Sequence, residues 1–566
     1  MFTRIPAMRQ MKKNSDRKIR EDGGKLFLGL DLSTQALKAL LIDNKSRVHY
    51  ETAINYDRDL PEFKTNGGVH RRSDGLTVTS PAIMWVAALD LLLEKMKADK
   101  VSLAKVAAIS GSGQQHGSVY FRHGAGGILA GLDSKKDLRS QLRRAFSITE
   151  SPVWMDSSTS RECRARDLAL GGAQATAEST GSRSYERFTG NQIAKIAKKY
   201  PRQYAETEQI TLVSSFLASL LIGGFAPIDT ADGAGMNLMN IVTKKWHNKA
   251  LACTAAGLAA KLPPLVAAHK PVGTIHDYFV RRYGFAAETL VIAFSGDNPN
   301  SLAAFGLDRP GSIAISLGTS DTIFGALTHP KPSAVEGHIF ANPIDPKGYM
   351  ALLCWKNGSL TREFVRDAHA RGSWDRFNRL LAQTPPGNNG LIGFYFKEPE
   401  ITPPVLKPGI HLFNSLKLAG RTGCAALPFE IPTQNIAPAQ HVRAVLESQF
   451  LSMRLHCENI GLKPRMIIAT GGASVNLLIL KIMADVFGQS ILTIERPNSA
   501  ALGAAMRALH GWKCLHAGKF IPFNRVISAV DRPKRKASPN GKNHRIYTAA
   551  LARYRRLEEL VAGRSE

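Results

Sequence analysis

Long apolar runs are missing from this sequence. No segment approaches the roughly 18–20 consecutive apolar residues that a membrane-spanning helix requires. The basic stretch over residues 1–20 lacks the apolar centre of a secretory signal, and the final Arg-Ser-Glu does not match a peroxisomal address. We therefore expect a cytoplasmic protein that has no membrane partner.

Cysteine is scarce as well. The six cysteines among 566 residues are scattered and include no CxxC pair, which argues against a zinc site and against a disulfide framework. A chain of this length can bury a large core and needs no such covalent staple. We expect incidental thiols in a reducing compartment.

Acidic residues are outnumbered, with 46 Asp and Glu against 74 Lys and Arg, so the formal net charge is +28. Such an excess is typical of proteins that bind nucleic acid or membrane surfaces. Part of it falls in residues 1–24, an expected disordered tail, and in 531–543, where we also expect a solvated extension. No zinc-finger, RNA-recognition or homeodomain pattern is present. We therefore expect an anionic substrate such as a nucleotide rather than nucleic acid as the main partner.

The predicted elements occur in a similar order in both halves of the chain, which is the strongest sign of its organisation. In each half, two apolar strands flank a polar turn, and a helical stripe then leads into another buried strand that ends in a glycine-rich turn. The first half has strands at 25–31, 37–43, 48–54 and 106–110 and a helix at 80–96; the second has strands at 289–294, 312–316, 321–327 and 466–470 and a helix at 442–457.

This order predicts an α/β protein with four segments. We expect a tail at 1–24, an N-terminal domain at 25–285, a C-terminal domain at 286–512, and a basic linker with a final helix at 513–566.

The two polar turns predict phosphate-binding sites. They are Asp31-Leu-Ser-Thr-Gln and Ser316-Leu-Gly-Thr-Ser-Asp. Small hydroxyl-bearing turns expose consecutive backbone N–H groups, which bind phosphate, and Asp31 could hold Mg²⁺ through water molecules. Either turn alone would be interpreted as an ordinary hairpin; the duplication favours two cradles for one polyphosphate.

Four further positions carry candidate chemistry. Gly471-Gly472 follows a strand and would let a nucleotide approach the backbone, although tight packing explains the pair equally well. Asp297 could accept a proton from an alcohol, or it could simply cap the helix that follows. His116 lies in a glycine-flanked turn and could bind a sugar hydroxyl or be an ordinary loop residue. Arg187 could clamp a polyol or be a surface arginine.

Taken in order, these segments resemble the FGGY carbohydrate kinases, and most of all the eukaryotic-type xylulose kinases among them. The resemblance covers about residues 25–510. It rests on Asp31-Leu-Ser-Thr-Gln, Gln114-Gln-His-Gly, Val153-Trp-Met-Asp-Ser-Ser, Ser182-Arg-Ser-Tyr-Glu-Arg-Phe-Thr-Gly-Asn-Gln, Gly296-Asp-Asn, Ser316-Leu-Gly-Thr-Ser-Asp, Leu353-Cys-Trp-Lys-Asn-Gly-Ser, Asn388-Asn-Gly-Leu-Ile-Gly-Phe-Tyr-Phe and Gly471-Gly-Ala-Ser. Ser33 departs from the glycine that many members have at this position, which makes the first turn stiffer.

The resemblance implies two ribonuclease-H-like domains of the actin/hexokinase/Hsp70 superfamily around a nucleotide cleft. It also implies ATP and Mg²⁺ as cofactors, with Asp297 as the catalytic base and Asp31 as the catalytic residue that organises the metal. The implied sugar-binding residues are His116, Arg187, Asp297 and Asn298. The implied ATP-binding residues are Ser33, Thr34, Gln35, Gly318, Thr319, Ser320, Trp374, Gly471, Gly472 and Asn476.

The activity implied by this resemblance is ATP-dependent phosphorylation of D-xylulose to D-xylulose 5-phosphate. Three alternatives stay open on the residues alone: a kinase for another pentulose or a polyol, an actin-like ATPase that is not a kinase, and a catalytically inactive sugar sensor. The expected partners are a small sugar and ATP, in a monomer or a homodimer.

Overall fold

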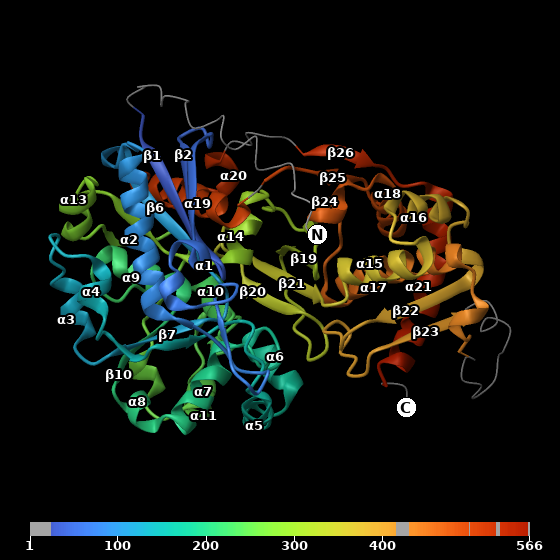
Figure 1. The fold of residues 1–566 in the computed structure, drawn as a ribbon, viewed down its shortest axis with the longest axis horizontal. Coiled ribbons are helices and arrows are strands. Elements are labelled where there is room, and N and C mark those ends of the chain that lie inside the picture. The colour runs from blue at the N-terminus through green and yellow to red at the C-terminus, as the bar shows by residue number, and fades with distance from the viewer. Residues whose placement is uncertain (1–23, 415–429, 497, 528–532, 564–566) are drawn as a thin grey trace.

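The computed structural model describes residues 24–414, 430–496, 498–527 and 533–563. Nearly all of the expected tail at 1–24 lies outside these residues, as do Cys424 and Asp531. The chain forms two lobes that lie side by side (Figure 1). We call residues 24–306 the N-terminal lobe and the described residues of 312–563 the C-terminal lobe. Among the described helices, none is both long and apolar enough to cross a membrane.

The N-terminal lobe is built on a mixed sheet whose first three strands form the expected antiparallel meander. Strand β6 then lies parallel to β1 on its other side. The strands of this sheet are β1 (Leu26–Leu32), β2 (Ala36–Asp43), β3 (Val48–Asn55), β6 (Val106–Gly113), β15 (Pro271–Thr274), β16 (Leu290–Ile292) and β17 (Ser295–Gly296). Because β16 and β17 both pair with β6, this sheet extends beyond residue 285, where the sequence placed the domain boundary.

The sheet of the C-terminal lobe repeats this arrangement. A meander of β18, β19 and β21 comes first, and β24 lies parallel to β18, as β6 lies parallel to β1. The strands are β18 (Ser312–Leu317), β19 (Asp321–Leu327), β20 (His338–Ala341), β21 (Tyr349–Trp355), β24 (Met466–Thr470), β25 (Ile491–Thr493) and β26 (Lys534–Ala537). The duplication inferred from the two polar turns is therefore a duplication of sheet topology.

Strand β26 corrects one expectation. The basic stretch near residue 534 was interpreted as a solvated extension, but Lys534–Ala537 pairs with β25 at the sheet edge. Its three basic side chains are exposed while Ala537 is buried. Exposed Lys and Arg are typical of edge strands, because charge discourages pairing with a second chain.

Helices cover both sheets, and smaller elements extend the N-terminal lobe downward in Figure 1. The helix expected at 80–96 is α2 (Ala82–Ala98), and the one expected around 442–457 is α17 (Pro438–Ile460). The C-terminal lobe also has α15 (Ser359–Ala370), α16 (Trp374–Ala382), α18 (Leu477–Phe487), α20 (Phe523–Val526), α21 (Gly541–Val561) and the hairpin of β22 (Leu391–Phe396) and β23 (Gly409–Asn414). The N-terminal lobe also has β7 (Ser118–Arg122), β8 (Phe146–Ile148), β10 (Thr207–Leu212), α5 (Ser160–Leu170), α6 (Ala173–Thr180), α7 (Thr189–Lys199), α9 (Val213–Ile222), α10 (Thr230–Ala234) and α13 (Asp277–Tyr283).

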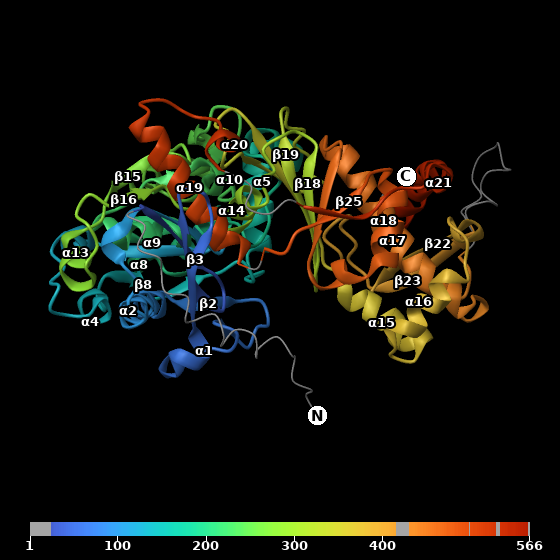
Figure 2. The same cartoon turned by 90° about the horizontal axis from the view of Figure 1, so that it is seen from above.

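The lobes are joined by two crossed helices, α14 (Asp297–Ala304) and α19 (Ser499–His516) (Figure 2). Helix α19 lies late in the chain but packs against β1 and α14 of the N-terminal lobe. Two glycines permit this approach. A Cβ on Gly29 would overlap the Ala501 carbonyl oxygen, and a Cβ on Gly503 would overlap the Asn300 carbonyl oxygen. A single apolar core consequently runs from the first sheet through both helices into the second sheet.

A buried histidine between two carboxylates holds the C-terminal helix in place. His456 on α17 lies 2.6 Å (Nδ1) from Glu336 and 3.1 Å (Nε2) from Glu558 on α21. Burial alone would lower the pKa of His456, but the charges and hydrogen bonds of the two glutamates outweigh it and raise the pKa to about 10. His456 is therefore charged at neutral pH and links α17 to α21.

We predict that His456→Gln lowers the free energy of unfolding by about 3–5 kcal/mol, because it leaves two buried carboxylates without their cation. A folded-state pKa above the unfolded value of about 6.5 means that this stabilisation is complete below pH 6.5 and is lost as the pH rises toward 10. Urea unfolding of both proteins at pH 6 and at pH 9.5 should thus show a smaller difference at the higher pH. An equal difference at both pH values would contradict a charged His456.

Candidate active site

Three strand ends bring the predicted catalytic residues together. Strands β1 and β17 flank β6 in parallel, and Asp31 and Ser295 are both registered with Ser112. Asp31 at the end of β1 therefore lies at the same sheet edge as Asp297, which follows β17. Their proximity is also seen electrostatically, since the charge of Asp31 raises the pKa of Asp297.

Asp31 is a buried carboxylate that lacks part of its hydrogen bonding. It is 2% exposed, and Lys38 Nζ lies 3.4 Å from its Oδ2. Its Oδ1 has no hydrogen-bond partner among the described residues. Burial raises the pKa of Asp31, although Lys38 and Ser112 oppose the shift. An oxygen left unpaired in a buried site fits a residue that receives a cation or its bound water.

Asp297 is the first residue inside α14, whereas Gly296 occupies the N-cap position, so the capping interpretation of Asp297 does not hold. Its Oδ1 accepts hydrogen bonds from the backbone N–H and the side-chain amide of Asn298, at 2.8 and 3.1 Å. Asn298 also donates to Gln115 at 2.8 Å. Burial, and then the charge of Asp31, raise the pKa of Asp297 to about 7.

His116 is held in an uncommon backbone conformation, with φ at 70°. Its Nδ1 lies 2.8 Å from the Gly235 carbonyl oxygen, and its ring contacts Phe188 with a centroid separation of 4.7 Å. Burial, and then the charge of Arg187, lower the pKa of His116 to about 3, so the ring is neutral. Because Nδ1 must donate to the carbonyl, Nε2 is left as an acceptor for a hydroxyl group.

Arg187 lies close to His116 but reaches toward the other lobe. Its Nη2 donates to Nε2 of His338, on β20, at 2.8 Å. The guanidinium also lies over the rings of Tyr185 and Phe188, with 5.4 and 5.9 Å to the ring centroids. The structure thus groups His116, Arg187, Asp297 and Asn298 around one edge of the first sheet.

The first polar turn lies at this edge too. Within it, the backbone N–H and the hydroxyl of Ser33 both donate to the Ala36 carbonyl oxygen, while Thr34 donates to Gln114. The turn continues into Gln35, whose carbonyl oxygen accepts from the backbone N–H of Tyr56. The backbone of this turn is consequently fixed by its own hydrogen bonds and by its neighbours.

The second polar turn lies beside the glycine pair. Strands β18 and β24 are parallel, with Ser316 registered with Thr470, so the turn at Gly318, Thr319 and Ser320 and the pair Gly471 and Gly472 share a sheet edge. Gly471 has a φ of 85°, and a Cβ there would lie 2.6 Å from the Leu317 carbonyl oxygen. Glycine at position 471 is therefore required by a close backbone approach.

A buried ion pair supports this second turn. Arg362 makes two hydrogen bonds to Asp321, of 2.7 and 2.9 Å, and both side chains are fully buried. Burial raises the pKa of Asp321, but the charge and hydrogen bonds of Arg362 oppose the shift. Sequence analysis did not single out this pair, because its members are 41 residues apart and share no local motif.

Asn476 and Trp374 are brought to neighbouring positions. Asn476 caps α18, and its side-chain amide donates to Asn378 on α16 at 3.0 Å. Trp374 is the first residue of α16 and lies under the guanidinium of Arg366, 4.8 Å from the ring centroid. The ATP-binding residues predicted in the C-terminal lobe therefore lie on three adjoining elements: the second turn, the Gly471 loop and α16.

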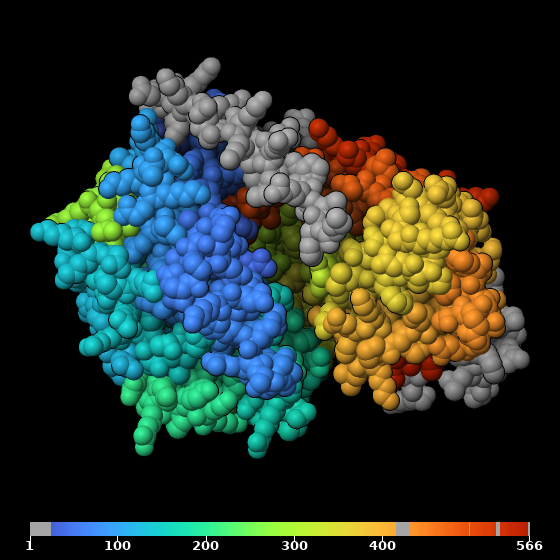
Figure 3. Space-filling view, in the orientation of Figure 1, coloured from blue at the N-terminus to red at the C-terminus, as the bar shows by residue number. Residues whose placement is uncertain are grey.

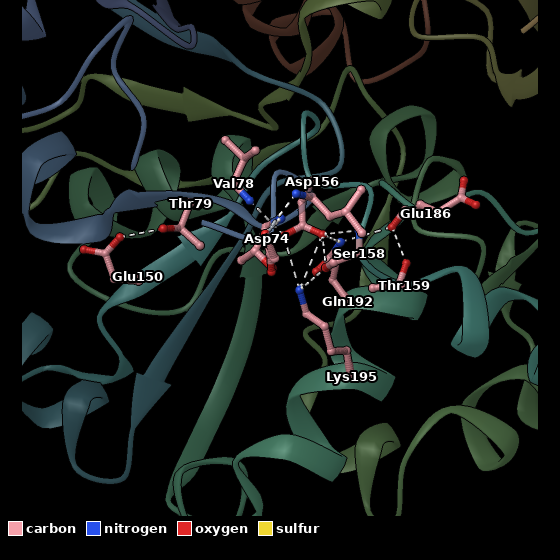
Figure 4. A network of polar contacts seen from close by, with 12 residues as sticks. Asp74, Val78, Thr79, Glu150, Asp156, Ser158, Thr159, Glu186, Gln192 and Lys195 are labelled. Atoms are coloured by element: carbon pink, nitrogen blue, oxygen red, sulfur yellow. Dashed lines mark hydrogen bonds and ion pairs between the residues drawn. The ribbon is translucent and has the colours of Figure 1, made fainter. Parts of the chain in front are cut away.

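The sequence also did not reveal the hydrogen-bond network around Asp156 (Figure 4), although the segment 153–158 contributed to the family resemblance. Asp156 is 1% exposed and accepts from Val78 N, Ser158, Gln192 and Lys195, the last at 3.2 Å. Burial would raise the pKa of Asp156, but Lys195 and the hydrogen bonds lower it. The neighbouring indole of Trp154 donates to Thr34 at 2.9 Å. The network thus fixes the loop that braces the first polar turn.

The residues around Asp31 and Asp297 belong to the N-terminal lobe, and those around the second polar turn belong to the C-terminal lobe. Figure 3 shows that the surface is hollowed between the two lobes.

A family model described as the N-terminal domain of the FGGY family of carbohydrate kinases matches residues 26–306, and the model of its C-terminal domain matches 313–512. The chain is 48% identical to a xylulose kinase of Mus musculus over 542 residues, covering 95% of each chain. It is 49% identical to xylulose kinase 2 of Arabidopsis thaliana, covering 88% of this chain and 90% of the relative.

Solved structures show the same fold at low sequence identity. A structure titled as a xyloylose kinase from Brucella ovis superposes with a TM-score of 0.77 at 21% identity, covering 95% of this chain and 100% of that one. The predicted α/β fold, with two sheet-containing domains, is confirmed by these structures.

Asp31 and Asp156 should respond to the same substitution in opposite ways. We predict that Asp31→Asn raises the free energy of unfolding by about 1–2 kcal/mol, because it removes a buried charge with an unpaired oxygen. Asp156→Asn should lower it by about 3 kcal/mol, because it breaks a satisfied, buried ion pair. Urea unfolding at pH 7.5 without nucleotide measures both. Destabilisation by both variants would contradict the electrostatic difference between the two sites.

Proposed function

We propose that this chain, which belongs to the FGGY family of carbohydrate kinases, transfers the γ-phosphoryl group of ATP to D-xylulose and releases D-xylulose 5-phosphate and ADP. The observation that carries the proposal is the grouping of Asp297, Asn298, His116 and Arg187 at the sheet edge that also holds Asp31 and the first polar turn. The names of its relatives support xylulose as the acceptor.

In this proposal Asp297 is the general base. As the sugar hydroxyl oxygen forms its bond to phosphorus, its O–H bond breaks and the proton passes to a carboxylate oxygen of Asp297. A pKa of about 7 leaves a large fraction of Asp297 ionised at neutral pH while keeping it a stronger base than an exposed aspartate. Asn298 donates to Oδ1 and so fixes the direction of the carboxylate.

The remaining pocket residues have complementary hydrogen-bonding roles. Neutral His116 offers Nε2 as an acceptor, whereas Arg187 offers N–H donors that no described carboxylate engages in an ion pair. A ketose presents hydroxyl and carbonyl oxygens, so it needs both kinds of partner. Rigid placement of the acceptor hydroxyl supplies much of the rate gain in such reactions.

We assign nucleotide binding to the C-terminal lobe and to the two polar turns. Ser33, Thr34 and Gln35 would face the phosphates from one side, and Gly318, Thr319 and Ser320 from the other. Gly471, Gly472, Asn476 and Trp374 would line the adenosine part of the site. The unpaired oxygen of Asp31 fits Mg²⁺ held through water, and bound Mg²⁺ would screen the phosphate charge.

We predict that Asp297→Asn lowers kcat by about 10²–10⁴-fold, because the amide cannot accept the proton. Its KM for D-xylulose should change little, since Asn298 and Arg187 still bind the sugar. Coupled detection of ADP measures both constants. Asp277→Asn, at an exposed position of α13, is the matched control and should behave as the unmodified enzyme does. Full activity of folded Asp297→Asn would eliminate it as the base.

The identity of the phosphoryl acceptor is tested by comparing D-xylulose with other alcohol substrates. D-xylulose should give the highest kcat/KM in a panel that includes D-ribulose and glycerol. A higher kcat/KM for another sugar would mean that this sugar, and not D-xylulose, is the acceptor. Release of ADP that no sugar accelerates would favour an ATPase.

A further inference from the structure

One segment of the N-terminal lobe, residues 181–188, lies against the C-terminal lobe. The Gly181 carbonyl oxygen accepts from Ile339 N at 3.0 Å, and the Tyr185 hydroxyl donates to the Glu336 carbonyl oxygen at 3.2 Å. A Cβ on Gly181 would overlap the Ile339 carbonyl oxygen, so the contact is close enough to require glycine. Arg187 is presented to the sugar pocket by this segment, and the contacts made with residues 336–339 therefore help to place it.

His338 is the polar side chain on the far side of this contact. An arginine can only donate, so Nε2 of His338 must accept from Arg187 and carries no proton. Burial, and then the charge of Arg187, lower the pKa of His338 well below its ordinary value. The ring is consequently neutral, and its one proton lies on Nδ1.

That Nδ1 atom is buried and has no hydrogen-bond partner among the described residues. The ring otherwise packs edge-on against Tyr185 and Phe188, at centroid separations of 4.7 and 5.0 Å. A phenylalanine could make the same packing contacts without leaving a buried donor unpaired, and such a donor costs free energy. Packing therefore does not explain a histidine here, whereas the hydrogen bond to Arg187 does.

The hydrogen bond to His338 is also well suited to a substrate-binding arginine. No described carboxylate lies within ion-pair distance of Arg187, so a neutral acceptor orients the guanidinium without neutralising it. The planar guanidinium then keeps its remaining N–H groups available for sugar oxygens.

We propose that His338 is a positioning residue of the sugar pocket, contributed by the C-terminal lobe, and that it acts on the ketose through Arg187. This inference rests on the proposed function, because it assigns the sugar to the pocket of Arg187. One consequence is that the sugar pocket is incomplete without the nucleotide-binding lobe. Sugar affinity is thereby coupled to the relative position of the two lobes.

The decisive variant is His338→Phe. We expect its thermal unfolding midpoint to change little, because removal of the unpaired buried donor offsets the loss of the hydrogen bond to Arg187, which is only half-buried. Its KM for D-xylulose should rise roughly 10- to 100-fold, the change in affinity expected when a hydrogen bond to a charged group is lost, while its KM for ATP stays the same. His338→Gln places an amide oxygen near the position of Nε2 and should restore most of the affinity.

A matched control separates this role from general damage to the lobe. His441 on α17 is equally buried, but its ring nitrogens lie within hydrogen-bond distance of the Tyr395 hydroxyl, at 2.9 Å, and of the Thr433 carbonyl oxygen, at 3.1 Å. His441→Phe should therefore lower the unfolding midpoint and leave the KM for D-xylulose unchanged. The opposite responses of two buried histidines in one lobe are the signature of positioning at His338.

A double-mutant cycle tests whether His338 acts through Arg187. In an Arg187→Met background, His338→Phe should cause no further rise in the KM. An equal rise in both backgrounds, or an unchanged KM in the single variant, would overturn the inference. The function is judged separately on the unmodified enzyme: if that enzyme prefers another sugar, the proposed acceptor is wrong, and the same cycle is measured with the preferred sugar.

Discussion

The proximity of two carboxylates, one buried (Asp31) and one half-buried (Asp297), is the constraint on which the site depends. Parallel pairing of β1, β6 and β17 leaves Asp31 and Asp297 at one sheet edge, where burial and the charge of Asp31 raise the pKa of Asp297. Such an arrangement is unfavourable in the isolated protein, and the proposed Mg²⁺ and sugar hydroxyl would relieve it. The rest of the molecule, two sheets clamped by α14 and α19, is large enough to hold the carboxylates in this arrangement.

Buried polar groups in this chain differ in how completely they are paired with hydrogen-bond or charge partners. Asp156 and His456 are surrounded by partners of opposite charge or by donors, and they hold loops and helices in place. Asp31 Oδ1 and His338 Nδ1 are among the buried atoms without partners; Asp31 lies at the proposed metal site, and His338 contacts the proposed sugar-binding residue Arg187 through its other ring nitrogen.

Local patterns in the sequence were sufficient for the central strands of both sheets (β1, β2, β3, β6, β16, β18, β19 and β24) and for the two polar turns, because apolar runs and small hydroxyl residues act over short distances. Strands β15, β17, β20, β21 and β25 were not predicted. The prediction for Asp297 needed the whole set of motifs, since its local sequence alone favours a helix cap. Contacts between distant segments left no local signal: Arg187 meets His338 across 151 residues, and Arg362 meets Asp321 across 41. Strand β26 was missed because its three charges imitate an unfolded linker.

The late position of α19 in the chain has a consequence for biosynthesis. During translation the strands of the first sheet emerge early, but the face of β1 at Gly29 has no cover until Ala501 and Ala505 have left the ribosome. The nascent N-terminal lobe must therefore wait, with part of its apolar surface open, for almost the entire polypeptide to be made. Chaperones bind exposed apolar surface of this kind during synthesis. A prematurely terminated product would keep that apolar surface exposed.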